Sequence, residues 1–293
     1  MLFITGSESF IGKKLIQKCK ENNIKYFGID SKSKKSKNSK KIDIRNKNIG
    51  KFIPKNSTII HLAAISKDSE CNSNPSLCMN VNINGTLNLI KAAKKRLVKN
   101  FIFASSEWVY GDNRPKLLDE NSELHIKKNF SLYAMSKIIL ERFLINTKPF
   151  QNINILRFGI IYGGQKKQNW SAVEGLFHKI IKSNTLSIGS KNTSRNYIHL
   201  DDLINGILLS TKSKGINIYN LTGDEKITLK RIIDLTLKFS KKRLKLVEKN
   251  PNNPSTRYIN NLKAKKHFKW KISMKIEKYI KKLYTNAKNY EKS

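Results

Sequence analysis

The sequence predicts an α/β protein built around a parallel sheet, and three observations support this fold class. Short apolar runs alternate with stretches of helical spacing through the first half of the 293 residues. Hydrophobic residues (39%) and aromatic residues (9%) are numerous enough to bury a core, which excludes a disordered chain. No window offers the roughly 18 apolar residues that a membrane span needs, and the first residues lack a basic leader. We therefore expect a cytoplasmic globular protein.

The expected elements follow from the period of the apolar residues. In the first half, the β-rich runs bounded by polar residues or glycine are Leu2–Thr5, Tyr26–Ile29, Thr58–Leu62, Phe101–Ala104 and Ile153–Phe158. The helices expected between them are Ile11–Asn22, Asn84–Leu97 and Ser131–Asn146. In the second half we expect helices at Ala172–Ser183, Asp202–Ser210, Thr228–Ser240 and Met274–Tyr284, with strands at Leu186–Ile188, Tyr197–Leu200 and Asn217–Leu221. The Lys/Ser-rich stretch Ser31–Lys41 is expected to be a solvated loop.

A glycine-containing turn lies between the first expected strand and the first expected helix. It reads Thr5-Gly6-Ser7-Glu8-Ser9-Phe10-Ile11-Gly12. A bound pyrophosphate needs a tight turn, close backbone approach, and a helix N-terminus whose free N–H groups face the anion. Gly6 and Gly12 suit the turn and the packing of helix on strand, while Ser9 stands where a second glycine would let the phosphate approach most closely. Alone, this pattern is a weak signal.

Asp30 strengthens the signal because it ends the second expected strand, 18 residues after Gly12. A carboxylate at this position accepts hydrogen bonds from the ribose hydroxyls of adenosine and repels a 2′-phosphate. The sequence therefore favours NAD over NADP, although Lys32, Lys34 and Lys35 nearby leave NADP open.

Candidate catalytic residues follow the strand Phe101–Ala104. Ser106 lies just after this strand, and in an open α/β sheet sites lie beyond the carboxyl ends of strands. Tyr133 follows 27 residues later, with Lys137 one helical turn beyond it on the same face. An unperturbed tyrosine, with a pKa near 10, is a poor base at neutral pH. We expect the Lys137 ammonium and a positively charged nicotinamide to lower the Tyr133 pKa, with Ser106 bonding the same substrate oxygen.

With these residues, the chain resembles the extended short-chain dehydrogenase/reductases, specifically the NAD-dependent nucleotide-sugar epimerase/dehydratase family. The resemblance covers nearly the whole length. The motifs in the family's order are TGxxxFIG (5–12), Asp30, Asp43-Ile44, His61-Leu62-Ala63-Ala64, Asn82-Ile83-Asn84-Gly85-Thr86, SSxxVYG (105–111), YxxSK (133–137), Leu156-Arg157-Phe158-Gly159-Ile160-Ile161-Tyr162-Gly163 and Ser194-Arg195-Asn196-Tyr197-Ile198-His199-Leu200-Asp201-Asp202. Each piece is modestly specific, but the ordered set is strong.

The resemblance implies a Rossmann-type doubly wound parallel sheet with a smaller mixed α/β C-terminal substrate lobe. Residues 1–163 would form the NAD-binding domain, with a returning segment near 194–221, and residues 164–293 would mainly hold a nucleotide diphosphate sugar. The helices 84–97 and 131–146 match those that form a four-helix homodimer interface in relatives.

The resemblance also implies roles for individual residues. The implied cofactor positions are Gly6, Ser9, Phe10, Ile11, Gly12, Asp30, Asp43, Ile44, Leu62, Ala63, Ala64, Asn82, Tyr133 and Lys137; Asp43 and Ile44 would lie at the adenine. The implied substrate positions are Ser106, Glu107, Arg195 and Arg257, and the two arginines would clamp the diphosphate. Ser106, Tyr133 and Lys137 would be catalytic.

Three departures from the family pattern bear on the reaction. Ser9 replaces the middle glycine of the turn. Ile160 stands where many relatives have an asparagine near the sugar or its phosphate, and the Lys166–Ser171 stretch carries no transferable specificity code. Trp108 occupies the second position of the adjacent acid pair found in 4,6-dehydratases. Elimination needs an acid and a base at those places, so dehydration is disfavoured, although Glu107 could act alone.

Three classes of function then compete. The leading hypothesis is an NAD-dependent nucleotide-sugar epimerase acting at C4 through a transient 4-keto sugar, in a pathway such as polysaccharide biosynthesis. The alternative is an NAD(P)-dependent reductase or dehydrogenase of a ketosugar nucleotide, with net cofactor turnover. A non-catalytic relative that senses NAD or binds polyanions is disfavoured because it would need neither Tyr133 nor Lys137.

The charge is strongly basic, with 58 Lys+Arg against 21 Asp+Glu, a formal net charge of +37. Lysine dominates, with 49 Lys and 9 Arg, whereas base readout and phosphate clamps favour arginine. We therefore expect no nucleic-acid partner and attribute most of the charge to base-composition drift. Residues 238–293 nevertheless carry 18 Lys/Arg against 3 acids, so a positive field there could steer an anionic substrate.

The three cysteines, Cys19, Cys71 and Cys78, are odd in number and lack CxxC spacing. We expect reduced thiols and neither a disulfide framework nor a zinc site. The histidines are scattered too widely to complete a metal site, so no metal is expected.

Overall fold

The computed structural model describes residues 1–33, 36–113, 116–124, 131–164 and 171–291. The chain divides into two compact units. Unit 1 comprises Met1–Gly111, Glu123–Arg157 and Ile204–Tyr219, and unit 2 comprises Asp112–Ser122, Phe158–Leu203 and Asn220–Ser293. Each unit therefore contains segments from distant parts of the sequence.

Unit 1 is organised around a seven-stranded sheet with the order β10-β6-β5-β4-β1-β2-β3. The strands are β1 (Leu2–Thr5), β2 (Tyr26–Asp30), β3 (Ser39–Lys41), β4 (Thr58–His61), β5 (Asn100–Ser106), β6 (Asn152–Phe158) and β10 (Ile216–Leu221). The strands from β3 through β5 pair in parallel; Leu2, for example, lies opposite Tyr26 on one side and Thr58 on the other. This is the mostly parallel Rossmann-type sheet that the sequence predicts, because each crossover carries a helix or loop back over the sheet.

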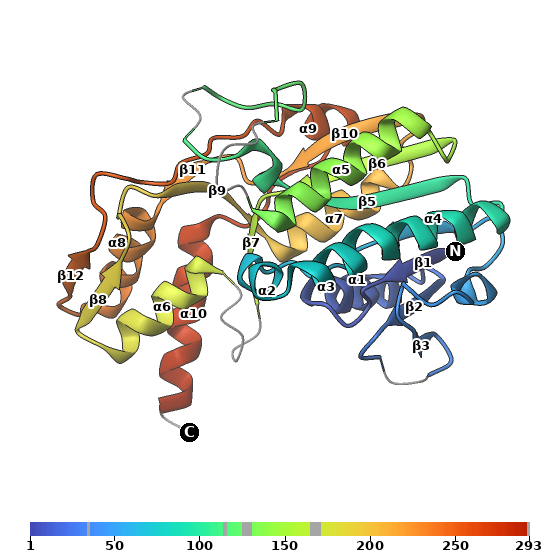
Figure 1. The fold of residues 1–293 in the computed structure, drawn as a ribbon. Helices are drawn as coiled ribbons and strands as arrows, with labels where there is room; N and C mark the ends of the chain where they lie inside the picture. Colours follow the sequence, from blue (N-terminus) through green and yellow to red (C-terminus); the bar gives the residue numbers. More distant parts are fainter. Residues whose placement is uncertain (34–35, 114–115, 125–130, 165–170, 292–293) are drawn as a thin grey trace. The chain divides into compact units, whose positions relative to one another are not determined.

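The helical segments associated with this sheet are α1 (Phe10–Glu21), η1 (Ile49–Phe52), α2 (Asp68–Ser73), α3 (Pro75–Met79), the π-turn η2 (Asn80–Asn84), α4 (Gly85–Lys95), η3 (Glu107–Tyr110), α5 (Leu132–Thr147) and α7 (Leu200–Ser210). Figure 1 shows α4 and α5 running along one face of the sheet. The helix starts are capped by side chains: Ser9 accepts the Gly12 N–H at the start of α1, and Ser131 accepts the Ala134 N–H at the start of α5.

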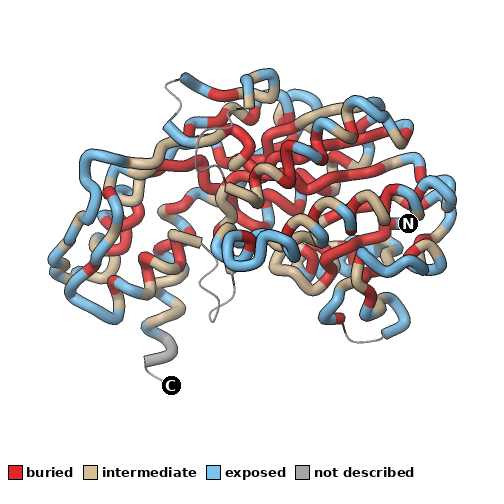
Figure 2. The backbone as a smooth tube through the Cα atoms, in the orientation of Figure 1, coloured by how far each residue is buried: buried red, intermediate tan, exposed pale blue. Residues whose placement is uncertain are grey.

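The core of unit 1 is the apolar layer between the sheet and these two helices. Side chains of β1, β4, β5 and β6 pack there against α4 and α5; the fully buried members include Phe3, Ile59, Leu89, Phe101, Phe103, Leu144, Ile153 and Ile155. Figure 2 shows the central strands buried along most of their length. A sheet buried on its faces needs near-continuous apolar strands, which explains why β1, β2, β4, β5 and β6 could be predicted from their apolar runs.

Unit 2 contains two small sheets and its own helical core. Strand β9 (Ser194–His199) lies between β7 (Ile160–Tyr162) and β11 (Lys226–Thr228), and β8 (Thr185–Ile188) pairs in parallel with β12 (Lys245–Glu248). The helices are α6 (Ala172–Lys182), α8 (Leu229–Ser240), α9 (Leu262–Phe268) and α10 (Ile276–Glu291). Ile276, Tyr279 and Ile280 face the core, which confirms the expected amphipathic helix.

Two expectations require correction here. The stretch Ser31–Lys41 is not wholly a loop, because Ser39–Lys41 forms β3 and pairs in parallel with Gly28–Asp30. This strand depends on pairing with β2 and has no apolar run of its own, so local composition could not reveal it.

Among the described residues, no helix is both long and apolar enough to cross a bilayer.

The expectation of three reduced thiols is wrong for Cys71 and Cys78, which are joined in a disulfide. Helices α2 and α3 meet at Asn74, whose side chain caps α3, and this tight corner brings the two Cα atoms to 5.0 Å. Cys19 is a free, buried thiol in α1.

Candidate active site

Two predicted site residues, Asp30 and Ser106, lie at the same edge of the sheet in unit 1. Strands β2, β1, β4 and β5 are consecutive neighbours, and they end at Asp30, Thr5, His61 and Ser106 respectively. Carboxyl ends of parallel strands lie along the same edge, where open α/β sheets bind their ligands. The order of the strands, and not the spacing in sequence, brings these positions together.

The glycine turn is closely packed against the end of β4. Gly6 has a φ of +72°, and a Cβ there would lie 2.7 Å from the Ala63 backbone nitrogen. A Cβ on Gly12 would lie 2.2 Å from the Gly6 carbonyl oxygen. Both positions therefore require glycine, and the turn leads directly into the N-terminus of α1, where Ser9 is the capping residue.

Asp30, at the end of the neighbouring strand β2, binds the glycine turn through its carboxylate. Its Oδ2 accepts the Glu8 N–H at 3.1 Å, and its Oδ1 accepts the Lys32 N–H at 2.9 Å. The carboxylate is thereby fixed beside the turn while its remaining lone pairs can accept further hydrogen bonds. Lys34 and Lys35, the lysines that left NADP open, lie outside the described residues.

Three other predicted cofactor positions are engaged within the chain. The Asp43 carboxylate pairs with Arg45 at 2.7 Å, and this pairing lowers the Asp43 pKa. The Ile44 side chain is in the core beside Gly85. Asn82 is buried, and its amide bonds both the N–H and the C=O of Ile65, at 2.8 and 3.0 Å. The carboxamide thus orients the chain that follows the segment Leu62, Ala63 and Ala64.

The predicted catalytic residues lie on adjoining elements of unit 1. Ser106 ends β5, and its Oγ accepts the Trp108 N–H at 3.3 Å. The Ser106 hydroxyl is near enough to Tyr133 to oppose the rise of the tyrosine pKa. Tyr133 and Lys137 are one turn apart on α5, with the Lys137 Nζ 5.5 Å from the centre of the tyrosine ring and 4.8 Å from that of Phe103. The structure therefore brings together the three residues that the sequence singled out.

Burial governs the charge states of this group in the chain alone. We expected Lys137 and a bound nicotinamide together to lower the pKa of Tyr133; in the chain alone, burial raises this pKa to about 12, and the Ser106 hydroxyl opposes the rise. Burial lowers the pKa of Lys137 to about 8, and the Glu141 carboxylate opposes that shift. Desolvation thus outweighs the local ammonium in the chain by itself, since both changes disfavour the charged form.

Glu107 and Trp108 occupy the positions of the dehydratase acid pair. Both lie in η3, directly after Ser106, and Glu107 is buried whereas Trp108 is partly buried. Only one carboxyl group therefore stands next to the serine where a 4,6-elimination would use two.

The two arginines that were predicted to clamp a diphosphate both lie in unit 2. Arg195, on β9, and Arg257 are both buried, and both donate to the same Asp112 oxygen, Oδ1. Arg195 also donates to the Ser255 carbonyl at 2.7 Å. One carboxylate thus fixes two guanidinium groups side by side, and their charges lower the Asp112 pKa although burial alone would raise it.

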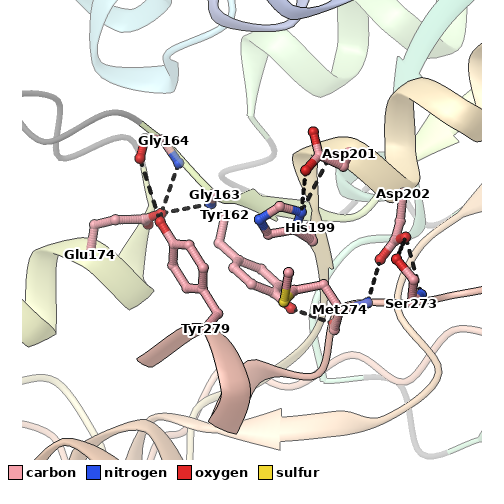
Figure 3. Close-up of polar contacts among 10 residues, drawn as sticks. All are labelled: Tyr162, Gly163, Gly164, Glu174, His199, Asp201, Asp202, Ser273, Met274 and Tyr279. Carbon is pink, nitrogen blue, oxygen red and sulfur yellow. Dashed lines mark hydrogen bonds and ion pairs between the residues drawn. The ribbon is translucent and has the colours of Figure 1, made fainter. Parts of the chain in front are cut away.

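Two further carboxylates anchor the last helix of unit 2 (Figure 3). Glu174 accepts the Gly163 N–H at 2.7 Å and the Tyr279 hydroxyl at 2.8 Å, so it ties the end of β7 to α10. Asp202 accepts the N–H groups of Ser273 and Met274, at 3.1 and 3.0 Å, just before α10. The Glu174 bond to Gly163 fixes the end of the strand β7, which carries Ile160. Residues 166–170 of the expected specificity stretch lie outside the described residues.

Sequence reasoning missed Asp112, Glu141 and Glu174. Asp112 directly follows the SSxxVYG motif, and Glu141 lies one turn beyond Lys137, so both positions carried a signal that could have been used. Glu174 had no such signal, because its partners come from distant segments.

Comparison with known proteins decides the family. The family model described as "NAD dependent epimerase/dehydratase family" matches residues 2–222. The chain belongs to this family. It is accordingly an enzyme of the extended short-chain dehydrogenase/reductase type, as its motifs indicated. Within the described residues, no group of three or more His, Cys, Asp or Glu side chains is placed to hold a metal ion.

Relatives of this family align over most of the chain. It is 28% identical over 269 residues to a UDP-glucuronate 4-epimerase of Thermodesulfobacterium geofontis, covering 88% of this chain and 82% of the relative. It is 25% identical to a putative UDP-glucose 4-epimerase of Methanocaldococcus jannaschii, covering 80% and 81%. The fold is similar to that of the UDP-glucose 4-epimerase of Thermus thermophilus in complex with NAD, with a TM-score of 0.80, 21% identity, and 96% of each chain covered.

The residues of unit 1 fit the cofactor of this family. The Gly6 position leaves no room for a side chain and presents the N-terminus of α1, which suits a pyrophosphate. Asp30, at the end of β2, supplies acceptors for ribose hydroxyls, and the Lys137 ammonium lies beside Phe103 of β5 in the same sheet. This donor and acceptor set matches NAD.

Proposed function

We propose that this chain is an NAD-dependent epimerase that inverts C4 of a UDP-linked sugar. The observation that carries the proposal is the grouping of Tyr133 and Lys137, one turn apart on α5, with Ser106 at the end of β5, the sheet edge that also carries Asp30. The relatives that align over most of the chain are named as 4-epimerases of UDP-sugars, which supports the assignment of the reaction and of the nucleotide.

The roles of the three residues follow from their chemistry. When bound, NAD supplies reversible hydride acceptance at the carbon being inverted. Tyr133 takes the proton of the C4 hydroxyl and later returns it, and Ser106 holds the same oxygen through its hydroxyl. Lys137, as an ammonium, stabilises the phenolate of Tyr133 and binds the nicotinamide ribose. After the keto sugar has rotated in the site, the hydride held by the bound cofactor would return to the opposite face of C4, and Tyr133 would return the proton to the C4 oxygen.

An epimerase is favoured over a dehydratase because of Trp108. Loss of water across C5 and C6 requires an acid and a base beside the sugar, and indole supplies neither. Glu107 can supply only one of the two groups, the acid or the base, that dehydration requires.

We propose that the cofactor and the substrate are bound by the parts of the chain that the sequence predicted. Residues 1–163, with a returning segment near 194–221, bind NAD, and residues 164–293 mainly bind the nucleotide sugar. Arg195 and Arg257 contact the diphosphate, because paired guanidinium groups offer several directed donors to phosphate oxygens. The excess of lysine in residues 238–293 adds a positive field that attracts the anionic substrate.

We also propose a homodimer that works in the cytoplasm, in polysaccharide biosynthesis. Helix α5 exposes 43% of Ile139 and leaves Met135 and Phe143 half-buried on the same side. Such an apolar strip on a surface helix suits a helical interface with a second copy. Replacement of Ile139 by glutamate should shift the purified protein to a monomer in size-exclusion chromatography with light scattering.

The experiment that tests the reaction uses a panel of UDP- and GDP-sugars. The purified protein is incubated with each, and the anomeric protons are followed by NMR. We expect the signal of the C4 epimer to appear with a UDP-sugar and no lasting change in absorbance at 340 nm, because an epimerase regenerates its cofactor. A steady change at 340 nm would indicate a reductase or dehydrogenase instead, and unchanged spectra across the panel would refute the proposal.

A further inference from the structure

The catalytic face of α5 continues one turn beyond Lys137. Tyr133, Lys137 and Glu141 are spaced four residues apart, so they lie in a row on the side of the helix that faces β5. Lys137 is 3% exposed and Glu141 is 1% exposed. A carboxylate thus stands, shielded from water, next in line to the two residues of the proposed proton transfer.

Glu141 is held from two strands. The Arg157 guanidinium, on β6, donates Nη2–H to Oε2 at 2.7 Å and Nε–H to Oε1 at 3.1 Å. The Ser105 hydroxyl, on β5, donates to Oε1. Arg157 also donates to the Tyr110 hydroxyl at 2.9 Å and lies over its ring. The carboxylate therefore links α5 to the strand ends on both sides of it, and every one of these contacts lies in unit 1.

Stability alone is a poor reason for this arrangement. A buried ion pair loses hydration on both partners, and apolar side chains of similar volume often serve the fold equally well. The location points elsewhere, because Ser105 directly precedes Ser106 and Glu141 directly follows Lys137 on the helix face. Any shift of the Glu141 carboxylate would move the Ser105 hydroxyl or change the electrostatic potential at the Lys137 ammonium.

The titratable and charged side chains around Lys137 belong to four elements. Tyr133 and Glu141 lie on α5, Arg157 on β6, Tyr110 in η3 and His61 on β4. Burial and the nearby Lys137 lower the pKa of His61 to about 3, so that ring is neutral at pH 7. Glu141 is the carboxylate that favours the charged form of Lys137, whose pKa burial lowers to about 8.

We propose that Glu141 is a positioning residue of the active site: its carboxylate, clamped by Arg157, holds Ser105 and hence Ser106 in place and supplies the negative charge that keeps Lys137 an ammonium. This role rests on the proposed function, since it assigns Glu141 to the same proton transfer. Glu141 acts through Ser106 and Lys137 and does not contact the sugar.

The test compares Glu141→Gln with the double variant Glu141→Met/Arg157→Met, which removes the pair without leaving a buried charge alone. Asp234→Asn is the matched control, because Asp234 forms an exposed i,i+4 ion pair with Lys230 at 2.7 Å. Two quantities are measured on the full chain. One is the pH profile of kcat and KM; the other is the titration of the lysine side chains by NMR with ¹³C-labelled lysine and no substrate, the Lys137 signal being assigned with Lys137→Met.

In the wild type, one lysine should titrate near pH 8. In both Glu141 variants it should titrate about one pH unit lower, so about fivefold less of it is protonated at pH 8. The alkaline limb of kcat should move by the same amount while KM changes little, and Asp234→Asn should match the wild type.

The inference is overturned if a folded Glu141 variant keeps the wild-type lysine titration and the wild-type alkaline limb. If neither variant folds, the NMR titration of the wild type decides. The inference is also overturned if no lysine of the wild type titrates below pH 9. A wild type that converts no sugar would instead refute the proposed function, and the substrate-free titration separates the two failures.

Discussion

The guanidinium of Arg257 pairs with the carboxylate of Asp112, with 2.6 Å between Nη2 and Oδ1, across 145 positions of the sequence. Arg257 is 2% exposed, and Arg195 reaches the same oxygen at 3.1 Å. The negative charge of Asp112 therefore holds together two cations that would otherwise repel each other. Two residues proposed to bind diphosphate are preorganised by a third.

Replacing Arg257 by methionine should weaken substrate binding more than turnover. A charge-assisted hydrogen bond to phosphate contributes about 1.5–3 kcal/mol, so KM for the UDP-sugar should rise about 10-fold to 100-fold with kcat nearly unchanged. Asp112→Asn should also raise KM, because it releases both guanidinium groups from their shared partner. Asp234→Asn, which removes the exposed ion pair with Lys230, is the control and should leave KM unchanged. An unchanged KM in the methionine variant would leave Arg257 a purely structural partner of Asp112.

The Tyr133→Phe variant should lose catalysis and keep the fold. The ring and its contact with Lys137 remain, but the proton carrier is gone, so kcat should fall by about 10²-fold to 10⁴-fold. NAD content after purification and the melting temperature should stay close to those of the wild type. Activity above a tenth of the wild type would show that another group carries the proton.

Ser9→Gly should separate helix capping from cofactor binding. The Ser9 Oγ accepts the Gly12 N–H at 3.0 Å, and a glycine cap costs only a few tenths of a kcal/mol. Removing the Cβ restores the family's glycine and should tighten NAD binding in titration calorimetry. Thr228→Gly removes the cap of α8, which accepts the Arg231 N–H at 3.1 Å, and should leave NAD affinity unaltered. Equal NAD affinities in all three proteins would mean that Ser9 does not limit the approach of the pyrophosphate.

His61 should make the fold sensitive to mild acid. Its Nδ1 bonds Thr5 at 2.6 Å and its Nε2 bonds Thr86 at 2.8 Å, and its pKa is lowered to about 3. Between pH 6.5 and pH 3 the unfolded chain binds a proton there that the folded chain does not. Stability from this residue is therefore complete above pH 6.5 and falls by about 1.4 kcal/mol per pH unit below it.

Denaturant titrations at pH 7 and pH 5 check this sign. The wild type should lose about 2 kcal/mol more than His61→Gln between the two values. The exposed His267, replaced by glutamine, is the control and should follow the wild type. Parallel losses in all three proteins would mean that His61 does not remain neutral in the fold.

The elements that the sequence predicted well are those with a local cause. The strand Leu2–Thr5 was predicted residue for residue, because a buried parallel strand is apolar throughout. The features that escaped prediction depend on a contact that no apolar period reveals. Ser39–Lys41 becomes a strand only by pairing with β2, and Cys71 and Cys78 meet only because two short helices turn at Asn74.

The sequence by itself determined the family, the cofactor-binding turn and the identity of the candidate catalytic residues, since each is written in a short spacing that a helix or a turn converts directly into geometry. Only the tertiary structure decided their electrostatics. Whether Tyr133 and Lys137 are charged depends on how deeply they are buried and on Glu141 and Arg157. The charge states of these two residues depend on the exclusion of solvent and on distances to charged groups, and both are set only when separate strands and helices pack together.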